Sequence, residues 1–213
     1  IGGDLTFTGA GNIVMNHTLT GSGYNLIKNG TGTLTLGGTN TYTGSTTVNS
    51  GILSVASSSG LGSAAGSTTV ASGGALELQG NITVADAISV TGTGASSTGA
   101  LRNLSGTNFV TGLVTLTGDT KVQSDAGSLT ILPASGNAIT GNYALTFDGA
   151  GTTSVGALGI AAAGTFTKAG AGRLNLLTAN TFSGGITLNA GTLGIYDNAA
   201  AGTGAITAAD STT

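Results

Sequence analysis

Short apolar pairs separated by one residue recur along the whole chain. They are Leu5/Phe7, Leu34/Leu36, Leu53/Val55, Leu76/Leu78, Ile82/Val84, Val114/Leu116, Leu129/Ile131, Leu145/Phe147, Leu174/Leu176, Ile186/Leu188 and Leu193/Ile195. Thr, Ser, Asn or Gly usually flank each pair, so the alternation predicts strands of roughly three to five residues with one apolar face. The helical spacing i, i+3, i+4, i+7 is missing. The pattern therefore predicts an all-β chain.

Strands this short bury too few side chains to be stable alone, so we expect the core to form by stacking. The separations of Leu34 from Leu53 and of Leu53 from Leu76 predict coils of roughly 20 residues, and therefore about ten coils. At ~4.8 Å between stacked strands, such a rod is roughly 50 Å long. We expect residues 1–213 to form a single continuous β-solenoid with glycine-rich corners.

The chain also matches itself at an offset of about 140 residues, which marks a long internal repeat. Residues 5–55 align without gaps with residues 145–195, and 18 of the 51 positions are identical. The longest matching block pairs "KNGTGTLTLGGTNTYTGSTTVNSGILSV" with "KAGAGRLNLLTANTFSGGITLNAGTLGI". Because one added residue would turn side chains from core to solvent, the unchanged length predicts that a fixed number of coils separates the copies.

Residues 28–55 resemble the passenger-associated transport repeat, also called the autotransporter-associated β-strand repeat, whose pattern is roughly K-x-G-x-G-T-L-x-L-x-G-x-N-T-Y-x-G-x-T-x-V-x-x-G-x-L. The second copy departs from this pattern at Arg173, Leu177 and Thr178, and Phe182 replaces the Tyr. The resemblance implies a right-handed parallel β-helix in the passenger of a Gram-negative autotransporter or a related surface protein. It also implies a partner outside this chain, the family's outer-membrane β-barrel translocator.

Composition narrows the range of partners. Five basic and eight acidic residues give a net charge of −3, which leaves too little positive field for nucleic acid or an anionic membrane. A mean hydropathy of +0.33 with only 6% charged residues excludes a disordered acidic tail. The absence of Cys excludes disulfides and Cys-ligated zinc.

Catalytic chemistry has few candidates in this chain. We expect no catalytic, cofactor-binding or metal-binding residues, no cofactor and no small-molecule substrate. His17, the single His, is expected to face solvent. Glu77, the single Glu, alternates with Leu76 and Leu78 and is expected on a solvated face, where its replacement by Ala would be nearly silent.

Two other functions are possible for a β-solenoid, and both receive little support from the sequence. A polysaccharide-acting enzyme needs paired carboxylates, for which Asp119 and Asp125, with Lys121 between them, and Asp86 are the candidates. Isolated Asp residues in glycine-rich turns instead favour Asx turns. Ice binding needs a flat Thr array, but the Thr-x-Thr tripeptides are irregularly spaced, which predicts that they do not share one face.

The repeated polar and aromatic residues suggest structural roles. Asn40/Asn180 and Asn49/Asn189 are expected to adopt left-handed turns or to form amide ladders between coils. Tyr42 and Phe182 are expected to cap the apolar interior.

The leading hypothesis is a non-enzymatic structural repeat of a secreted or surface-displayed passenger, which supports export and forms a rod-like stalk. Each coil would template the next through short-range contacts. The alternative is an extracellular filament or adhesin that self-associates end to end, and the polysaccharide-acting enzyme is a distant third.

Overall fold

The computed structural model describes residues 2–157, 159–161 and 164–209, which are almost entirely strands and turns. The strands are β1 (Leu5–Phe7), β2 (Ile13–Met15), β3 (Leu26–Lys28), β4 (Thr33–Leu36), β5 (Thr46–Val48), β6 (Gly51–Val55), β7 (Ser67–Val70), β8 (Gly74–Gln79), β9 (Thr83–Val84), β10 (Ala87–Gly92), β11 (Leu101–Ser105), β12 (Thr107–Val110), β13 (Val114–Ser124), β14 (Ser128–Ile131), β15 (Ile139–Thr140), β16 (Leu145–Asp148), β17 (Thr152–Val155), β18 (Ile160–Ala161), β19 (Phe166–Lys168), β20 (Arg173–Leu176), β21 (Ile186–Leu188), β22 (Thr192–Ile195) and β23 (Ile206–Ala208). One turn of 3-10 helix (Ala95–Ser97) interrupts them. A search of these residues for an apolar helix of membrane-spanning length finds none.

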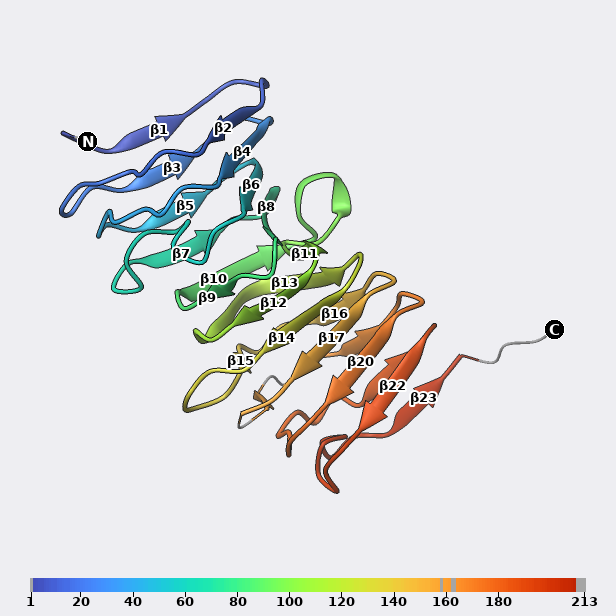
Figure 1. Cartoon of the computed structure of the whole chain (residues 1–213). Coiled ribbons are helices and arrows are strands. Elements are labelled where there is room, and N and C mark those ends of the chain that lie inside the picture. The colour runs from blue at the N-terminus through green and yellow to red at the C-terminus, as the bar shows by residue number, and fades with distance from the viewer. Residues whose placement is uncertain (1, 158, 162–163, 210–213) are drawn as a thin grey trace.

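The strands pair in parallel and form three ladders along one axis (Figure 1). Ladder 1 contains β1, β3, β5, β7, β10, the first part of β13, β15 and β18. Ladder 2 contains β2, β4, β6, β8, β11, the second part of β13, β16, β19, β21 and β23. Ladder 3 contains β9, β12, β14, β17, β20 and β22.

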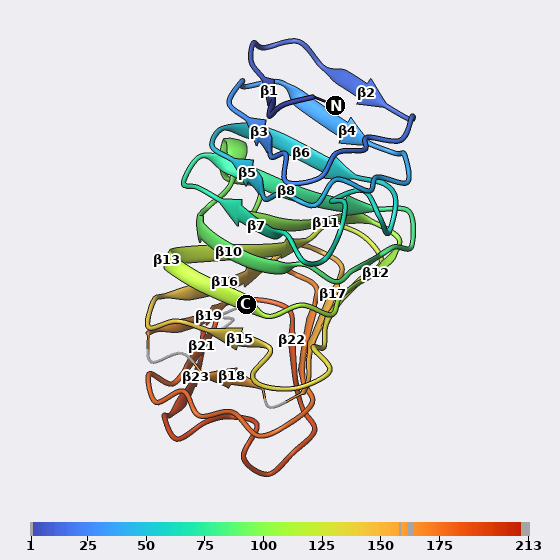
Figure 2. The ribbon, with the colours of Figure 1, turned by 90° about the vertical axis from the view of Figure 1, so that its left-hand side faces the viewer.

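The predicted parallel β-solenoid is confirmed. It has about ten turns of about 21 residues each. A quarter turn of the molecule shows the coils stacked from β1 at one end of the rod to β23 at the other (Figure 2).

The core runs along the axis as columns of side chains in register. In ladder 2, Leu34, Leu53 and Leu76 stack on one another, and each is 0% exposed. In the C-terminal coils Phe166 packs between two other rings, with centroids 5.3 Å from Phe147 and 5.1 Å from Phe182. Inward-facing side chains from three ladders thus supply the core that no single strand could form.

Ile195 is a correction to the predicted core. It lies on β22, where it was expected to face inward, but it is 41% exposed, and Leu193 is only partly buried. β22 is the last described strand of ladder 3, and the structure shows no strand paired with its outer edge. The alternation of residues along β22 was predicted correctly, but a side chain is buried only where a neighbouring coil also covers it.

The two repeat copies lie on different faces of the rod. In the first copy β3 belongs to ladder 1 and β4 to ladder 2, whereas their counterparts β19 and β20 belong to ladders 2 and 3. In ladder 1, the residue in register with Leu26 six coils later is Ile160. The residue that aligns with Leu26 in the second repeat copy is instead Phe166, which lies on the next face of the rod, in ladder 2. The offset between the copies therefore spans six coils and one face, not a whole number of coils.

The coils between the two copies contain more residues than those of the first copy, and this extra length shifts the second copy by one face. The in-register partners Glu77 and Arg102 are 25 residues apart. Within the first copy, the in-register partners Leu34 and Leu53 are only 19 apart. Ladder 3 begins in this central region, at β9, and gives these longer coils a third strand.

Candidate functional site

A buried lysine occupies one corner of each repeat copy. Lys28 ends β3 and Lys168 ends β19, and they are only 3% and 2% exposed. The ammonium of Lys28 donates to the carbonyl oxygen of Gly30 in its own turn and, at 3.3 Å, to that of Ser50 in the next coil. Lys168 binds the two equivalent carbonyls of the second copy. Burial lowers the pKa of both lysines. Each ammonium therefore ties one turn to the next.

Glycine is required beside this ammonium. Gly51 and its counterpart Gly191 have φ angles of +71° and +77°. A Cβ on Gly51 would lie only 2.8 Å from Nζ of Lys28. No role for Lys28 was predicted from the sequence, although two signals were present. The Lys and the Gly are identical in both copies, and Lys28 occupies an inward position of its strand.

We predict that replacing Lys28 by Met destabilises the first copy by about 1 to 3 kcal/mol, because the carbonyls of Gly30 and Ser50 lose a donor. Chemical denaturation monitored by circular dichroism measures this loss. The matched control is Thr31→Ala, at an exposed position of the same turn. Equal stability of Lys28→Met and the wild type would show that relief of the buried charge offsets the lost hydrogen bonds.

Asn40 and Asn180 bridge three successive coils. The Asn40 side-chain oxygen accepts from the backbone N–H of Leu19 at 2.8 Å, and its amide donates to the carbonyl of Gly60 at 2.6 Å. Asn180 makes the equivalent contacts with Ile160 and Ala200. The positive-φ residues do not include these two asparagines, so the predicted left-handed turn is wrong for them, and their side chains bond backbone groups of the neighbouring coils instead of forming the predicted amide ladder.

The remaining repeated residues are the asparagines at positions 49 and 189 and the aromatic residues at positions 42 and 182. Asn49 donates to the side chain of Asn29 at 2.7 Å, which is an amide ladder between coils, while the side chain of Asn189 is exposed. Tyr42 and Phe182 are both 1% exposed, as expected for residues that close the interior.

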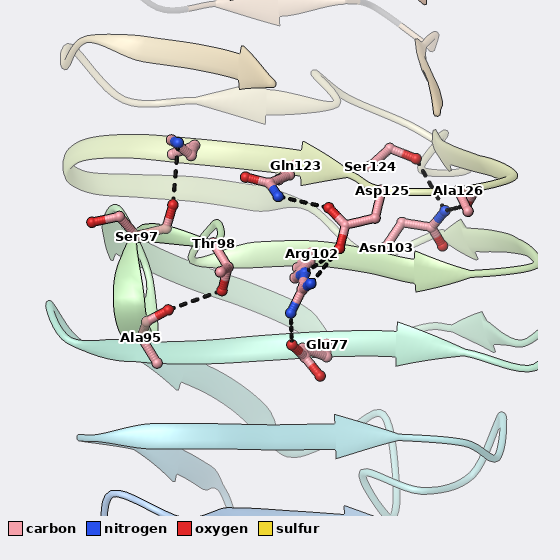
Figure 3. A network of polar contacts seen from close by, with 11 residues as sticks. Glu77, Ala95, Ser97, Thr98, Arg102, Asn103, Gln123, Ser124, Asp125 and Ala126 are labelled. Carbon is pink, nitrogen blue, oxygen red and sulfur yellow. Dashed lines mark hydrogen bonds and ion pairs between the residues drawn. The ribbon is translucent and has the colours of Figure 1, made fainter. Parts of the chain in front are cut away.

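Ion pairs cross four consecutive coils in the central region, and Figure 3 shows the first two of these pairs, which join Glu77, Arg102 and Asp125. Arg102 on β11 pairs with Glu77 on β8 and with Asp125 just after β13. The amide of Gln123 donates to the second oxygen of Asp125 at 2.6 Å. Burial opposes the charge of Arg102, but the hydrogen bonds and charges of its two partners outweigh burial and raise its pKa. One guanidinium thus links the coil below to the coil above.

Lys121 continues this series to the next coil. Its ammonium lies 2.8 Å from a carboxylate oxygen of Asp148, and this hydrogen bond lowers the pKa of Asp148. It also donates to the carbonyl of Ser97 at 3.2 Å, in a loop that projects from the rod between β10 and β11 (Figure 1). Ser96 and Ser97 have φ angles of +53° and +59°, so the backbone of this loop is strained, and the hydrogen bond from Lys121 holds it in place.

Glu77 is therefore a second correction. It was expected on a solvated face, but it is only 4% exposed because the side chain of Arg102 covers it. Its direction was predicted correctly, since it points away from Leu76 and Leu78, but its partner is 25 residues away on the next coil.

The candidate acid pair does not assemble. Asp119 is exposed and accepts from the backbone N–H of Ala144, Asp125 is paired with Arg102, and Asp86 lies in the interior. About 20 Å of extended chain separates Asp119 from Asp125, against the ~5 to 9.5 Å between glycosidase carboxylates. His17 is exposed, as predicted. A search of the described residues for three or more metal-ligating side chains in one group gave no candidate.

Hydroxyl side chains form a column on the outer face of ladder 1. Thr47, Thr69, Ser89, Thr115 and Thr140 occupy in-register positions on five consecutive coils. The Thr-x-Thr tripeptides are predicted from the sequence not to share one face, and this column shows that single Thr and Ser residues from successive coils do. Coils of unequal length conceal the register in the sequence, because the intervals between these residues range from 20 to 26.

A shallow hollow of about 480 Å³ lies near the C-terminal coils. It is lined by Asn137, Ala157, Thr178, Ala179 and Thr181. The Thr178 hydroxyl is the one buried side-chain polar atom without a hydrogen bond in the part of the chain that the structure describes. The described residues that line the hollow carry no charge, so they supply no group for acid–base chemistry.

Comparison with known proteins gives two matches. The family model of the passenger-associated-transport-repeat matches residues 26–55 and 166–195, which lie within the two copies that align with each other, residues 5–55 and 145–195. The Adhesin BmaC autotransporter of Brucella suis biovar 1 (strain 1330) is 41% identical over 104 residues. That alignment covers 48% of this chain and 3% of the adhesin. No solved structure matches the chain significantly.

Proposed function

Because the chain carries two copies of the passenger-associated-transport-repeat, we propose that it is a rod-forming, non-enzymatic segment of a surface-displayed autotransporter passenger in a Gram-negative bacterium. Its task is to supply coils that fold outside the outer membrane, support export through the translocator and form a stalk. The observation that carries this proposal is the pair of matched repeats built into one parallel β-solenoid.

The contacts suit a chain that folds coil by coil. Each strand pairs only with strands of the adjacent coils, so folding closes no long loops. Lys28 and Asn40 reach the next coil in the same way in both copies, which lets each finished coil hold the next one in register. With 6% charged residues and no Cys, little would resist passage of the unfolded chain through a narrow pore.

The test is deletion of residues 26–55 in the full-length protein, with surface-displayed passenger measured by protease accessibility on intact cells. We expect surface yield to fall. The matched control replaces residues 26–55 with residues 166–195, which have the same length and the same repeat pattern, and should restore export. Unchanged export after the deletion would contradict the proposal.

An adhesive rod is the second candidate, and the hydroxyl column of ladder 1 favours it. Hydroxyls both donate and accept, and the column holds no charge, so it suits contact with another uncharged polar surface. The adhesin relative agrees with this candidate. Replacing Thr47 and Thr69 together by Glu should lower cell adhesion without lowering surface yield, whereas filaments of the isolated chain in electron micrographs would support end-to-end self-association instead.

A further inference from the structure

The interior holds a carboxyl group that no cation neutralises. Asp86 lies in the two-residue connection between β9 and β10, where the first strand of ladder 3 leads back to ladder 1, and it is only 4% exposed. Its carboxylate accepts a hydrogen bond of 3.0 Å from the hydroxyl of Thr68, which is itself 0% exposed. Thr68 belongs to β7, so this bond joins two successive coils.

The surroundings of Asp86 are polar but uncharged. Tyr42, from the segment between β4 and β5, is the titratable group that interacts with it. Burial raises the pKa of Tyr42 to about 12, so this phenol stays neutral at physiological pH. Its hydroxyl lies 2.6 Å from that of Thr46, and Thr46 is in register with Thr68. A buried line of hydroxyls therefore leads to the carboxyl.

All five cations of the chain are engaged elsewhere. Lys28 and Lys168 bind turn carbonyls, and Arg102 and Lys121 form the ion pairs of ladder 2. Arg173 donates to the side chains of Asn175 and Tyr196. Ionisation of Asp86 would thus leave a buried negative charge that no cation balances and that accepts one hydrogen bond, from Thr68, which is costly away from bulk water.

We propose that Asp86 is a proton-dependent latch: the coils around β7, β9 and β10 are closed firmly when its carboxyl is protonated and open more readily when it ionises. The latch is a property of these coils and does not depend on the proposed function. It lies where the widened central coils begin, beyond the first repeat copy. A rod displayed outside the cell would therefore be tighter at this junction in acidic surroundings.

The direction of the effect follows from the proton affinity of the folded state. Burial raises the pKa of Asp86 from 3.8 to about 6, with the Thr68 hydrogen bond opposing the rise. The folded chain then binds the proton more tightly than the unfolded chain, so stability is lost as pH rises from about 4 to about 6 and stays low above that. This is the reverse of the usual salt-bridged carboxylate.

The test is amide hydrogen exchange of β7, β9 and β10 by NMR, corrected for intrinsic exchange rates. We expect the local opening constant of the wild type to be about tenfold larger at pH 8 than at pH 5. Asp86→Asn can keep the bond from Thr68 without a charge, so its opening constant should be lower than that of the wild type at pH 8 and constant across this range. A wild-type opening constant that does not change with pH would overturn the latch.

Two further measurements keep the test decisive. Asp119→Asn, at an exposed carboxyl, is the matched control and should retain the tenfold dependence. Should Asp86→Asn fail to fold, a carboxyl-carbon NMR titration of the wild type still decides: a midpoint for Asp86 near 6 supports the latch, and one near 4 overturns it. Retention of the full pH dependence in Asp86→Asn would also overturn it.

Discussion

Replacing Leu34 by Asp is expected to abolish cooperative folding of the first repeat copy. Leu34 is 0% exposed and lies between Ile13 and Leu53 in ladder 2. A carboxylate there would be enclosed between aliphatic side chains, on an axis only a few side chains wide. The cost of an unpaired buried charge is several kcal/mol, which consumes much of the roughly 5 to 15 kcal/mol that stabilises a folded domain. Far-UV circular dichroism with thermal denaturation measures the loss.

Leu174→Asp should have the same effect in the second copy, because Leu174 is also 0% exposed and stacks between Thr153 and Leu193 in ladder 3. The matched control is Thr35→Asp, one residue from Leu34 on the outer face of the same strand, for which we expect a change within about 0.5 kcal/mol. Equal melting temperatures for Leu34→Asp and Thr35→Asp would contradict the assignment of faces.

Leu34 and Thr35 show which part of the fold the sequence predicts. Whether a side chain points in or out depends on alternation within its own strand, which is a local property with a period of two. Short local strands also require stacking, so the parallel solenoid and its coil length follow from the same pattern. The ungapped internal repeat then identifies the corners where Gly51 and Gly191 are needed.

Glu77 and Ser89 show which part the sequence does not predict. Their surroundings depend on the residue in register on the next coil, and that register depends on the length of each coil. Arg102 reaches Glu77 because this coil is longer than those of the first copy, whereas a shorter coil would have placed another residue there. The rotation of the second copy by one face has the same origin. The number of residues in each coil depends on the geometry of its glycine-rich corners. These segments have no hydrophobic periodicity, so the sequence does not predict their length.

Replacing Arg102 by Leu should cause the second largest loss, about 2 to 4 kcal/mol. The change leaves the nearly buried carboxylate of Glu77 and the partly exposed carboxylate of Asp125 without their shared cation. We place the loss at the lower part of the range for buried ion pairs, because Arg102 and Asp125 retain 17% and 25% side-chain exposure and water screens the charge. Urea denaturation at pH 7 measures the change in the free energy of unfolding.

The control for Arg102→Leu is Arg173→Leu, which removes an exposed arginine that has no carboxylate partner among the described contacts and should change stability by less than about 1 kcal/mol. A double-mutant cycle with Glu77→Ala then separates the pair from its surroundings. If Arg102 clamps neighbouring coils, Glu77→Ala should be costly alone but nearly silent once Arg102→Leu is present, a coupling of about 1 to 3 kcal/mol. Additive losses would mean that the two side chains stabilise their coils separately, and the central coils would then be held by the backbone ladders and the interior alone.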